Sequence, residues 1–505
     1  MLTFVIGLVI LFVGGGLYGG LCQKVFSPDD RKTPAYLKSD GVDFVPMPKW
    51  KNALINLLNI AGTGPILGPI QGILFGPIAF ITIPIGCVIG GAMHDYFSGM
   101  ISVREGGIQM PEMVRINTGK GIHRLYTVFV SIVLFLIGVV FIYTPGDIAA
   151  TQVFGFGGTA GEASTWIIYS CIFVYYLIAT VFPIDKIIGK VYPVFGAVLL
   201  LSAVGVFIML FVKGYPLTEV WNAWNLNGFD FAAYFTDEKF IPSFFVTVAC
   251  GILSGFHSTQ ITLVTRTLEH EKEGRAAFYN MMIAEGFIAM VWAAGTMAMI
   301  GAGAANAGIT MQLGESGWSY YAMADGVLQK ISATSVVGVV CRNMLGPVGG
   351  LIAIAGVIIL PITSGDTALR SLRLILADTL HIRQDENKKR IMLALPVFAV
   401  AYAVLIWAKM QPNGFNVIWR YFGWSNQTLA VFALASILIW LMQHDRKKFL
   451  WIPLLPLVFY AFITCSYLCS ARIGLKLPYG ISLAIGAVFA AAVAAAAIIR
   501  GVRKS

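Results

Sequence analysis

Long apolar segments recur from one end of the chain to the other, and they constrain its fold more than any other feature. A helix needs about 20 consecutive apolar residues to cross the hydrocarbon core of a bilayer. Only 12% of the residues are charged, against about 25% in soluble domains. The pattern predicts an all-α polytopic membrane protein embedded in a lipid bilayer, with about 13 transmembrane helices. The predicted spans are residues 2–22, 52–76, 77–103, 124–145, 165–183, 191–212, 242–266, 276–303, 346–376, 391–409, 418–442, 450–470 and 478–500.

The basic residues predict how these helices are oriented. The formal net charge is +10, and most lysines and arginines fall on one side when loop 23–51 is placed in the cytoplasm. Such a bias marks the cytoplasmic side of membrane proteins. It predicts an outside N-terminus and a cytoplasmic C-terminus, and it accounts for the positive charge without a nucleic-acid partner. The first apolar run lacks the basic start and cleavage site of a signal peptide, so we expect a retained helix.

One span is interrupted by residues that disfavour helices. Five glycines and two prolines lie between Asn59 and Gly76, including the run Gly62-Thr63-Gly64-Pro65. Proline removes a backbone donor, and glycine has poor helix propensity. Inside a bilayer, freed backbone groups need partners from the protein or from a wet cavity. We interpret this stretch as a broken helix that can bind a polar ligand, in preference to a simple kink.

A second interruption is predicted at Ser254–His257, about a dozen residues into span 242–266. Without the first span and the last two, five spans remain from residue 53 and five from residue 242, which gives the halves opposite orientations. Broken helices at matching positions of inverted halves indicate a transport site near the bilayer midplane. The predicted organisation is an N-terminal helix and cytoplasmic loop (1–51), a first repeat (52–213), an extracellular loop (214–241), a second repeat (242–442) and C-terminal helices (443–505).

Half-helix ends offer free N–H groups and a positive dipole end, which suit a carboxylate. We therefore predict a substrate site between the two breaks. His257 is of interest there as a substrate donor or proton relay, although a buried histidine is often only a satisfied core residue. The candidate substrate-binding residues are Gly62, Thr63, Gly64, Pro65, Ser254, Gly255, Phe256, His257, Ser258 and Gln260.

Acidic residues at membrane depth are candidates for ion coupling, because a charge there is costly and usually functional. Glu285 lies about nine residues into its span and is either a proton carrier or a protonated structural group. His94 and Asp95 lie near the inner end of the third span. They form either a gate or coupling pair, or a helix-end hydrogen bond.

A further polar run follows Pro361 in the ninth span. Its hydroxyls, on Thr363, Ser364 and Thr367, can join carbonyls of the first break to bind Na⁺. Asp366 is expected to pair instead with Arg370, four residues on. The coupling ion is thus H⁺ or Na⁺, and no cofactor or metal cluster is expected.

Two outer segments could cover such a site. Loop 213–241 is rich in aromatic residues, as either an interfacial belt or a lid. Segment 304–345 is expected to hold a short re-entrant or surface helix around residues 318–332. The aromatic residues of the loop are Trp221, Trp224, Phe229, Phe231, Tyr234 and Phe235.

Several long motifs, in order, resemble the carbon starvation protein (CstA) family from about residue 49 to residue 443. The resemblance implies a bacterial inner-membrane secondary transporter with the five-plus-five inverted-repeat (APC/LeuT-like) fold, which takes up peptides, or pyruvate with protons, during carbon starvation. The chain is shorter than the long members of the family, which leaves the substrate open. The matching stretches are 61–69, 94–100 with Arg104 and Gly106-Gly107, 251–260, 274–286, 364–370 and 424–430.

Other functions remain open at this point. An intramembrane enzyme acting through Ser254 and His257 would need a base-orienting acid beside them, and none is placed there in the sequence. A channel would need a ring of symmetric elements. A sensory role stays open, whereas the intramembrane acids argue against a purely structural one. A symporter is therefore the leading interpretation, and an enzyme is not expected. The oligomeric state is left open.

Overall fold

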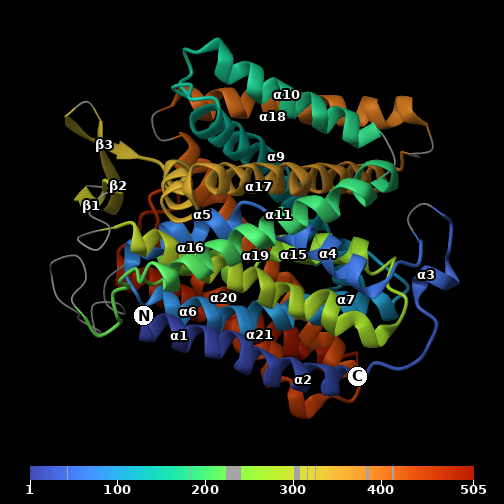
Figure 1. The fold of residues 1–505 in the computed structure, drawn as a ribbon. Helices are drawn as coiled ribbons and strands as arrows, with labels where there is room; N and C mark the ends of the chain where they lie inside the picture. Colours follow the sequence, from blue (N-terminus) through green and yellow to red (C-terminus); the bar gives the residue numbers. More distant parts are fainter. Residues whose placement is uncertain are drawn as a thin grey trace.

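Long helices dominate the computed structural model, which describes residues 1–41, 44–181, 184–222, 240–300, 307–314, 317–324, 326–382, 386–411 and 414–504. Figure 1 shows these helices lying side by side, with a small β-sheet at one end of the bundle and the short helix α3 at the other. We call these the sheet end and the α3 end. The N-terminus lies at the sheet end and the C-terminus at the α3 end. Which end faces the cytoplasm stays a prediction from the basic residues.

The first half of the chain forms α1 (Leu2–Val9), η1 (Ile10–Gly14), α2 (Gly15–Phe26), α3 (Pro34–Leu37), α4 (Lys49–Ile60), α5 (Gly64–Gly72), η2 (Ile73–Phe75), α6 (Ala79–Gly86), η3 (Cys87–Ala92), α7 (Met93–Arg104), α8 (Met110–Thr118), α9 (Lys120–Ile148), η4 (Ala149–Val153), α10 (Ala163–Val181) and α11 (Ile184–Val212). The second half forms α13 (Ser243–Thr247), α14 (Ala249–Ile252), α15 (Gly255–Val264), η5 (Glu271–Glu273), η6 (Arg275–Tyr279), α16 (Asn280–Ala298), β1 (Ile309–Gly314), β2 (Gly317–Ala324), β3 (Val327–Ile331), α17 (Ala333–Thr379), α18 (Asn387–Met410), α19 (Gly414–Gln443), η8 (Lys447–Phe449), α20 (Trp451–Ser470) and α21 (Tyr479–Val502). Helix α17 is kinked at Gly346, whose φ is 73°.

The described residues contain nine helical segments long and apolar enough to cross a bilayer. A tenth is the pair α4 and α5–η2, which is bent by 51° at the break between Ile60 and Gly64. Shorter apolar helices cover residues 163–179 and 196–212. The chain is therefore a multi-pass, mainly helical membrane protein, as the sequence predicts. The count of thirteen crossings stays a prediction.

Both sequence interruptions coincide with breaks in the helices. The first break covers residues 61–63, and Pro65 stands in the first turn of α5, where a missing N–H costs least. The second break lies at Leu253 and Ser254, both of which have extended backbone angles. This second break is slightly earlier than predicted, because Gly255 already opens α15 and His257 lies in its first turn.

The two broken segments pack against each other, and glycines make the contact possible. A Cβ on Gly64 would overlap Cys250, and one on Gly68 or Gly72 would press on Val248. The contacts move toward the start of the α13–α14 segment as α5 proceeds toward its end, so the two segments run antiparallel. The breaks are brought to a common level inside the bundle.

The segment around residues 318–332 is β-structure, and the prediction of a helix there is wrong. β1, β2 and β3 form an antiparallel meander with Ile309 opposite Ala322 and Tyr320 opposite Ile331. Aromatic and β-branched residues favour strands, and the Gly326 turn has a positive φ that suits a hairpin. The buried Tyr320 hydroxyl donates to the carbonyl of Ile70 on α5, so the sheet is attached to the α5 half of the first broken span.

The aromatic loop predicted over residues 213–241 is described only in part. Trp221 is exposed, whereas Trp224, Phe229, Phe231, Tyr234 and Phe235 lie outside the described residues. Neither the belt nor the lid interpretation is tested.

The first helix of the chain packs against helices that follow the second break and also against α6. A Cβ on Gly19 would overlap the ring of Tyr279, so the two helices are in close contact there. Arg275 donates to the carbonyl of Gly16 at 2.8 Å. The helix also exposes large apolar residues, among them Leu17 and part of Phe12, whose ring centroid lies 5.7 Å from that of Phe287 on α16, as expected for a lipid-facing surface.

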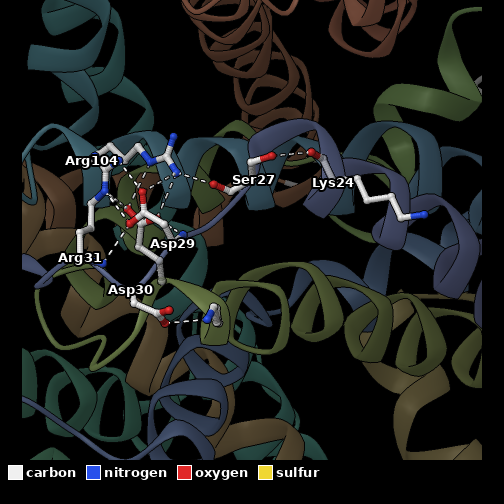
Figure 2. A network of polar contacts seen from close by, with 8 residues as sticks. Lys24, Ser27, Asp29, Asp30, Arg31 and Arg104 are labelled. Atoms are coloured by element: carbon white, nitrogen blue, oxygen red, sulfur yellow. Dashed lines mark hydrogen bonds and ion pairs between the residues drawn. The ribbon is translucent and has the colours of Figure 1, made fainter.

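An ion-pair network closes the α3 end around the buried carboxylate of Glu271. Arg104, at the end of α7, donates to both Glu271 oxygens at 3.2 Å and to the carbonyl of Ser27 at 2.7 Å. The backbone N–H of Asp29 also donates to Glu271. Figure 2 shows Arg31 and Arg104 converging beside Asp29. Hydrogen bonds from Arg31 hold the pKa of the Asp29 carboxyl below its usual range.

We expect Glu271→Gln to lower the free energy of unfolding by about 2–3 kcal/mol, because it leaves the Arg104 guanidinium without its buried counter-charge. Glu112→Gln is the matched control, since Glu112 forms an exposed i,i+3 pair with Arg115 and such pairs contribute about 0–1 kcal/mol. Thermal unfolding in detergent measures both. Equal unfolding temperatures for the two variants would show that the network does not stabilise the fold.

Candidate functional site

Four ionisable side chains form a continuous buried chain beside the two breaks. The Asp95 carboxylate is hydrogen-bonded by Nδ1 of His94 at 2.8 Å and by Nδ1 of His257 at 2.9 Å. Nε2 of His257 lies 3.4 Å from Oε2 of Glu285. All four side chains are 0% exposed. This row of four side chains connects α7, α15 and α16, three elements that are distant in sequence.

This arrangement can hold and pass a proton. Because Asp95 accepts from both Nδ1 atoms, each imidazole carries a proton at Nδ1. The remaining nitrogen of His257 faces Glu285, so one further proton can reside on either group. A spacing of 3.4 Å exceeds ordinary hydrogen-bond length, and a modest movement of α15 against α16 would make or break this contact.

The structure changes the interpretation of His94 and Asp95. They lie at the start of α7, about nine residues before its end at Arg104, and not near the inner end of the span. The π-helix η3 directly precedes them, and such irregular turns occur frequently at functional sites. Asp95 also contacts His257 on α15, so its hydrogen bonds are not confined to its own helix, and its role in gating or coupling stays a prediction.

Asn426 of α19 organises the second break, and sequence reasoning did not single it out. Its Oδ1 accepts from the backbone N–H of Phe256 at 2.8 Å and from the Ser254 hydroxyl at 3.1 Å. The hydroxyl that an intramembrane enzyme would use is therefore bonded to an amide and not to the His257 ring. Asn426 also occupies the N-terminal end of α15, the end predicted to face the substrate carboxylate.

We expect Asn426→Ala to lower the free energy of unfolding by about 1–3 kcal/mol, because a buried N–H loses its acceptor. Asn343→Ala is the control, since the Asn343 amide donates to Val339 on an exposed helix face. The melting temperature of the purified protein reports the difference. An unchanged melting temperature for Asn426→Ala would show that the amide does not hold the break.

Phe141 of α9 lies between the two breaks. A Cβ on Gly62 would overlap its ring, and the ring meets that of Phe256 edge-on with centroids 6.3 Å apart. The main-chain carbonyl of Phe141 accepts from the Tyr176 hydroxyl at 2.9 Å. An aromatic side chain thus fills the centre of the predicted substrate site. A lone phenylalanine in an apolar span gives no signal in the sequence.

The other predicted substrate residues lie around this centre. Thr63 is buried in the first break, and its hydroxyl has no hydrogen-bond partner among the described residues. Pro65 has no N–H to offer and serves to open α5. The Ser258 hydroxyl donates to the carbonyl of Gly255, and the Gln260 amide donates to Thr259.

The hydroxyl run of α17 reaches the first broken span through one residue. The Ser364 hydroxyl donates to the carbonyl of Leu58 on α4 at 2.9 Å. Thr363 and Thr367 donate to carbonyls within α17. Asp366 pairs with Arg370, with Oδ1 and Nη2 3.5 Å apart, as predicted from the i,i+4 spacing. Within the described residues, no group of three or more His, Cys, Asp and Glu is arranged to hold a metal ion.

A family model described as "Carbon starvation protein CstA" matches residues 1–147, 151–339 and 333–467. The chain belongs to the carbon starvation protein CstA family. Members of the family include the peptide transporter CstA of Escherichia coli strain K12, which is 25% identical over 87% of this chain and 76% of its own length. The peptide transporter CstA of Mycobacterium tuberculosis strain H37Rv is 25% identical over 90% and 73%. An uncharacterized membrane protein of Haemophilus influenzae is 41% identical over 58% of this chain and 89% of its own.

The fold of this CstA-family chain is also found among solved transporters. A mutant of the manganese transporter from Eremococcus coleocola superposes with a TM-score of 0.60, at 11% identity, over 92% of this chain and 99% of the other. This likeness concerns the fold alone. Together with the CstA relatives, it places the chain among membrane transporters.

Proposed function

We propose that this CstA-family protein is a proton-coupled symporter of the bacterial inner membrane, which takes up short peptides or a small carboxylate such as pyruvate during carbon starvation. Its core is a five-plus-five inverted repeat of residues 52–213 and 242–442, with one additional helix before it and two after it. The N-terminus faces outside and the C-terminus faces the cytoplasm. Both broken spans belong to the first helix of their repeat, as transport sites in such folds require.

The observation that carries the proposal is the buried chain from His94 through Asp95 and His257 to Glu285. Burying this many ionisable groups is costly unless they are paired or used. Each occupies an element next to a break, so a change in the breaks changes their spacing. Proton uptake at the His257–Glu285 pair is thereby linked to the substrate site.

The first break supplies the contacts for a substrate carboxylate. Thr63 is the N-cap of α5 and Gly64 is its first residue, so their N–H groups have no intrahelical acceptor and lie at the positive end of the helix. At the second break, Asn426 already accepts from the backbone N–H of Phe256. We therefore assign the substrate carboxylate to the first break alone. Rocking of the broken spans against α9 and α17 would move the Phe141 ring away from Gly62 and admit the substrate.

Proteoliposomes containing the purified protein test this function. An inward proton gradient should drive accumulation of labelled dialanine or pyruvate above its outside concentration, and a protonophore should abolish it. Protein-free liposomes are the control. Equal inside and outside concentrations under every imposed gradient would contradict coupled transport, and turnover of substrate without net movement would indicate an enzyme.

Sodium is the alternative coupling ion, because the Ser364 hydroxyl already contacts the first broken span. Uptake measured with choline in place of Na⁺ shows whether H⁺ or Na⁺ drives transport. If uptake collapses in choline and Ser364→Ala reproduces the collapse, Na⁺ is the driver. If uptake follows only the proton gradient, the buried carboxyl chain is the coupling element.

A further inference from the structure

Beside the first break, several buried polar side chains of α4 and α15 have oxygen atoms that accept no hydrogen bond from the described residues. Oδ1 of Asn56, Oδ1 of Asn59 and Oε1 of Gln260 have no hydrogen-bond partner among the described residues. The Thr63 hydroxyl, four residues after Asn59, also has none. All four residues are less than 5% exposed. Buried polar groups are nearly always paired, so four unpaired oxygens on or beside two helices that pack together need an explanation.

Hydrogen bonds fix the amide orientations of Asn56 and Gln260. The Asn56 amide nitrogen donates to the carbonyl of Ala277 at 2.7 Å, which only an N–H₂ group can do. The Gln260 amide nitrogen donates to the Thr259 hydroxyl at 3.1 Å, and that hydroxyl is itself committed as a donor to Phe256. Rotating either amide would bring two acceptors together. At Asn56 and Gln260 the unpaired atom is therefore an acceptor oxygen.

Packing of α4 against α15 brings Asn59 and Gln260 to the same level. Asn52 makes reciprocal hydrogen bonds with Thr267, one of 2.9 Å and one of 2.6 Å, so these residues are opposite each other. The helices run antiparallel. Asn59 lies seven residues after Asn52, and Gln260 lies seven residues before Thr267. Seven helical residues rise ~10.5 Å, and α15 ends at Val264, shortly before Thr267, so the two amides lie at similar levels of the packed helices beside the break.

The segments that carry this cluster contain no basic side chain, and two acidic side chains lie nearby. Residues 52–103, 243–265 and 276–329 contain no lysine or arginine, whereas Asp95 and Glu285 lie one helical turn away along α15 through their contacts with His257. Neutral oxygen acceptors backed by carboxylates suit a ligand that carries several N–H donors and a positive charge.

We propose that Asn56, Asn59, Thr63 and Gln260 form a subsite for a primary ammonium group, as found at the N-terminus of a peptide or on a free amino acid. The inference rests on the proposed function and deepens it. It selects substrates with a free amino group over pyruvate, which has none. The ammonium group is held by the amide oxygens of α4 and α15, while the carboxylate reaches the N–H groups of Thr63 and Gly64.

A ligand series on the unmodified protein tests the subsite without any mutation. Dialanine, N-acetyl-dialanine and pyruvate are compared as competitors of labelled dialanine and as stabilisers against thermal unfolding. We expect dialanine to bind at least tenfold more tightly than the acetylated peptide, which lacks the charge. Equal affinity for the two peptides, or tighter binding of pyruvate, would overturn the proposal.

Single substitutions test whether the preference for a free amino group comes from these residues. Asn59→Leu and Gln260→Met remove an acceptor and keep side-chain volume, and each should weaken dialanine binding at least tenfold while leaving N-acetyl-dialanine unchanged. Asn117→Leu is the matched control, because Asn117 on α8 is a buried asparagine with an unpaired Oδ1 far from the breaks. Equal losses in all three variants would contradict the assignment.

The same measurements separate this inference from the proposed function. Dialanine binding that depends on Asn59, without uptake driven by protons, supports the ammonium subsite and refutes symport. Proton-driven dialanine uptake that is insensitive to Asn59→Leu supports symport and refutes the subsite. Stabilisation by Na⁺ alone that is lost in Asn59→Leu would assign the oxygens to a metal cation and overturn the proposal.

Discussion

Glu285→Gln should abolish proton-driven accumulation and leave exchange of substrate across the membrane within about twofold of the unmodified protein. Glutamine keeps the shape of the side chain but cannot take up or release a proton. The ring of His257 then faces a group with a fixed protonation state, and loading of the site is no longer tied to the proton gradient. In proteoliposomes the inside-to-outside substrate ratio should fall to one.

Counterflow measurements give the control, because exchange of labelled for unlabelled substrate needs binding and alternating access but no net proton movement. Glu386→Gln is the matched acidic variant, since Glu386 forms an exposed pair with Lys389. A Glu285→Gln protein that still concentrates substrate against an imposed pH gradient would remove Glu285 from the coupling mechanism. Loss of counterflow as well would assign Glu285 to substrate binding or to the fold.

Gly255→Ala is expected to be the most damaging small substitution for folding. A Cβ at this position would overlap the main-chain oxygen of Asn426, the main-chain nitrogen of Ala430 and the Leu429 side chain. Backbone atoms of α19 cannot turn aside as a flexible side chain can. Overpacking costs about 1–3 kcal/mol in ordinary cores, and we expect about 3 kcal/mol or more here. Loss of the monodisperse peak in size-exclusion chromatography would report it.

Gly16→Ala provides the comparison. Gly16 lies inside α2, and a Cβ there meets nothing within 4 Å. Alanine is the better helix former by about 1 kcal/mol, so this variant should be as stable as the parent or more so. Equal behaviour of Gly255→Ala and Gly16→Ala would mean that α15 does not pack against α19 as described.

The sequence predicts those features that depend on local chemistry. Apolar length predicts the spans, the Gly/Pro run predicts the first break, and i,i+4 spacing predicts the Asp366–Arg370 pair. It does not predict contacts between residues far apart in the chain. Asn426 closes a break about 170 residues away, and Asp95 meets His257 across 162 residues. Residues such as these look like ordinary polar residues in apolar helices until the fold brings them together.

The error at residues 318–332 has a different cause. The glycine- and alanine-rich surroundings suggested a short helix, but the strands are set by cross-strand pairing, which a helical pattern search does not score. Phe141 could not be identified either, because its position opposite Gly62 depends on how α9 packs. The predicted substrate residues are brought together by the structure, and their roles stay proposals.

The lipid-facing first helix has a consequence for turnover. It is fastened at Gly16 and Gly19 to the helices after the second break and, through Ser27, to Arg104. In a rocking cycle the first helix would move together with these helices. Its exposed Phe12 and Leu17 would then displace the surrounding acyl chains. Viscous drag from the membrane would then contribute to the cycle time, and stiffer lipids would slow the protein even where every polar contact in its interior is unchanged.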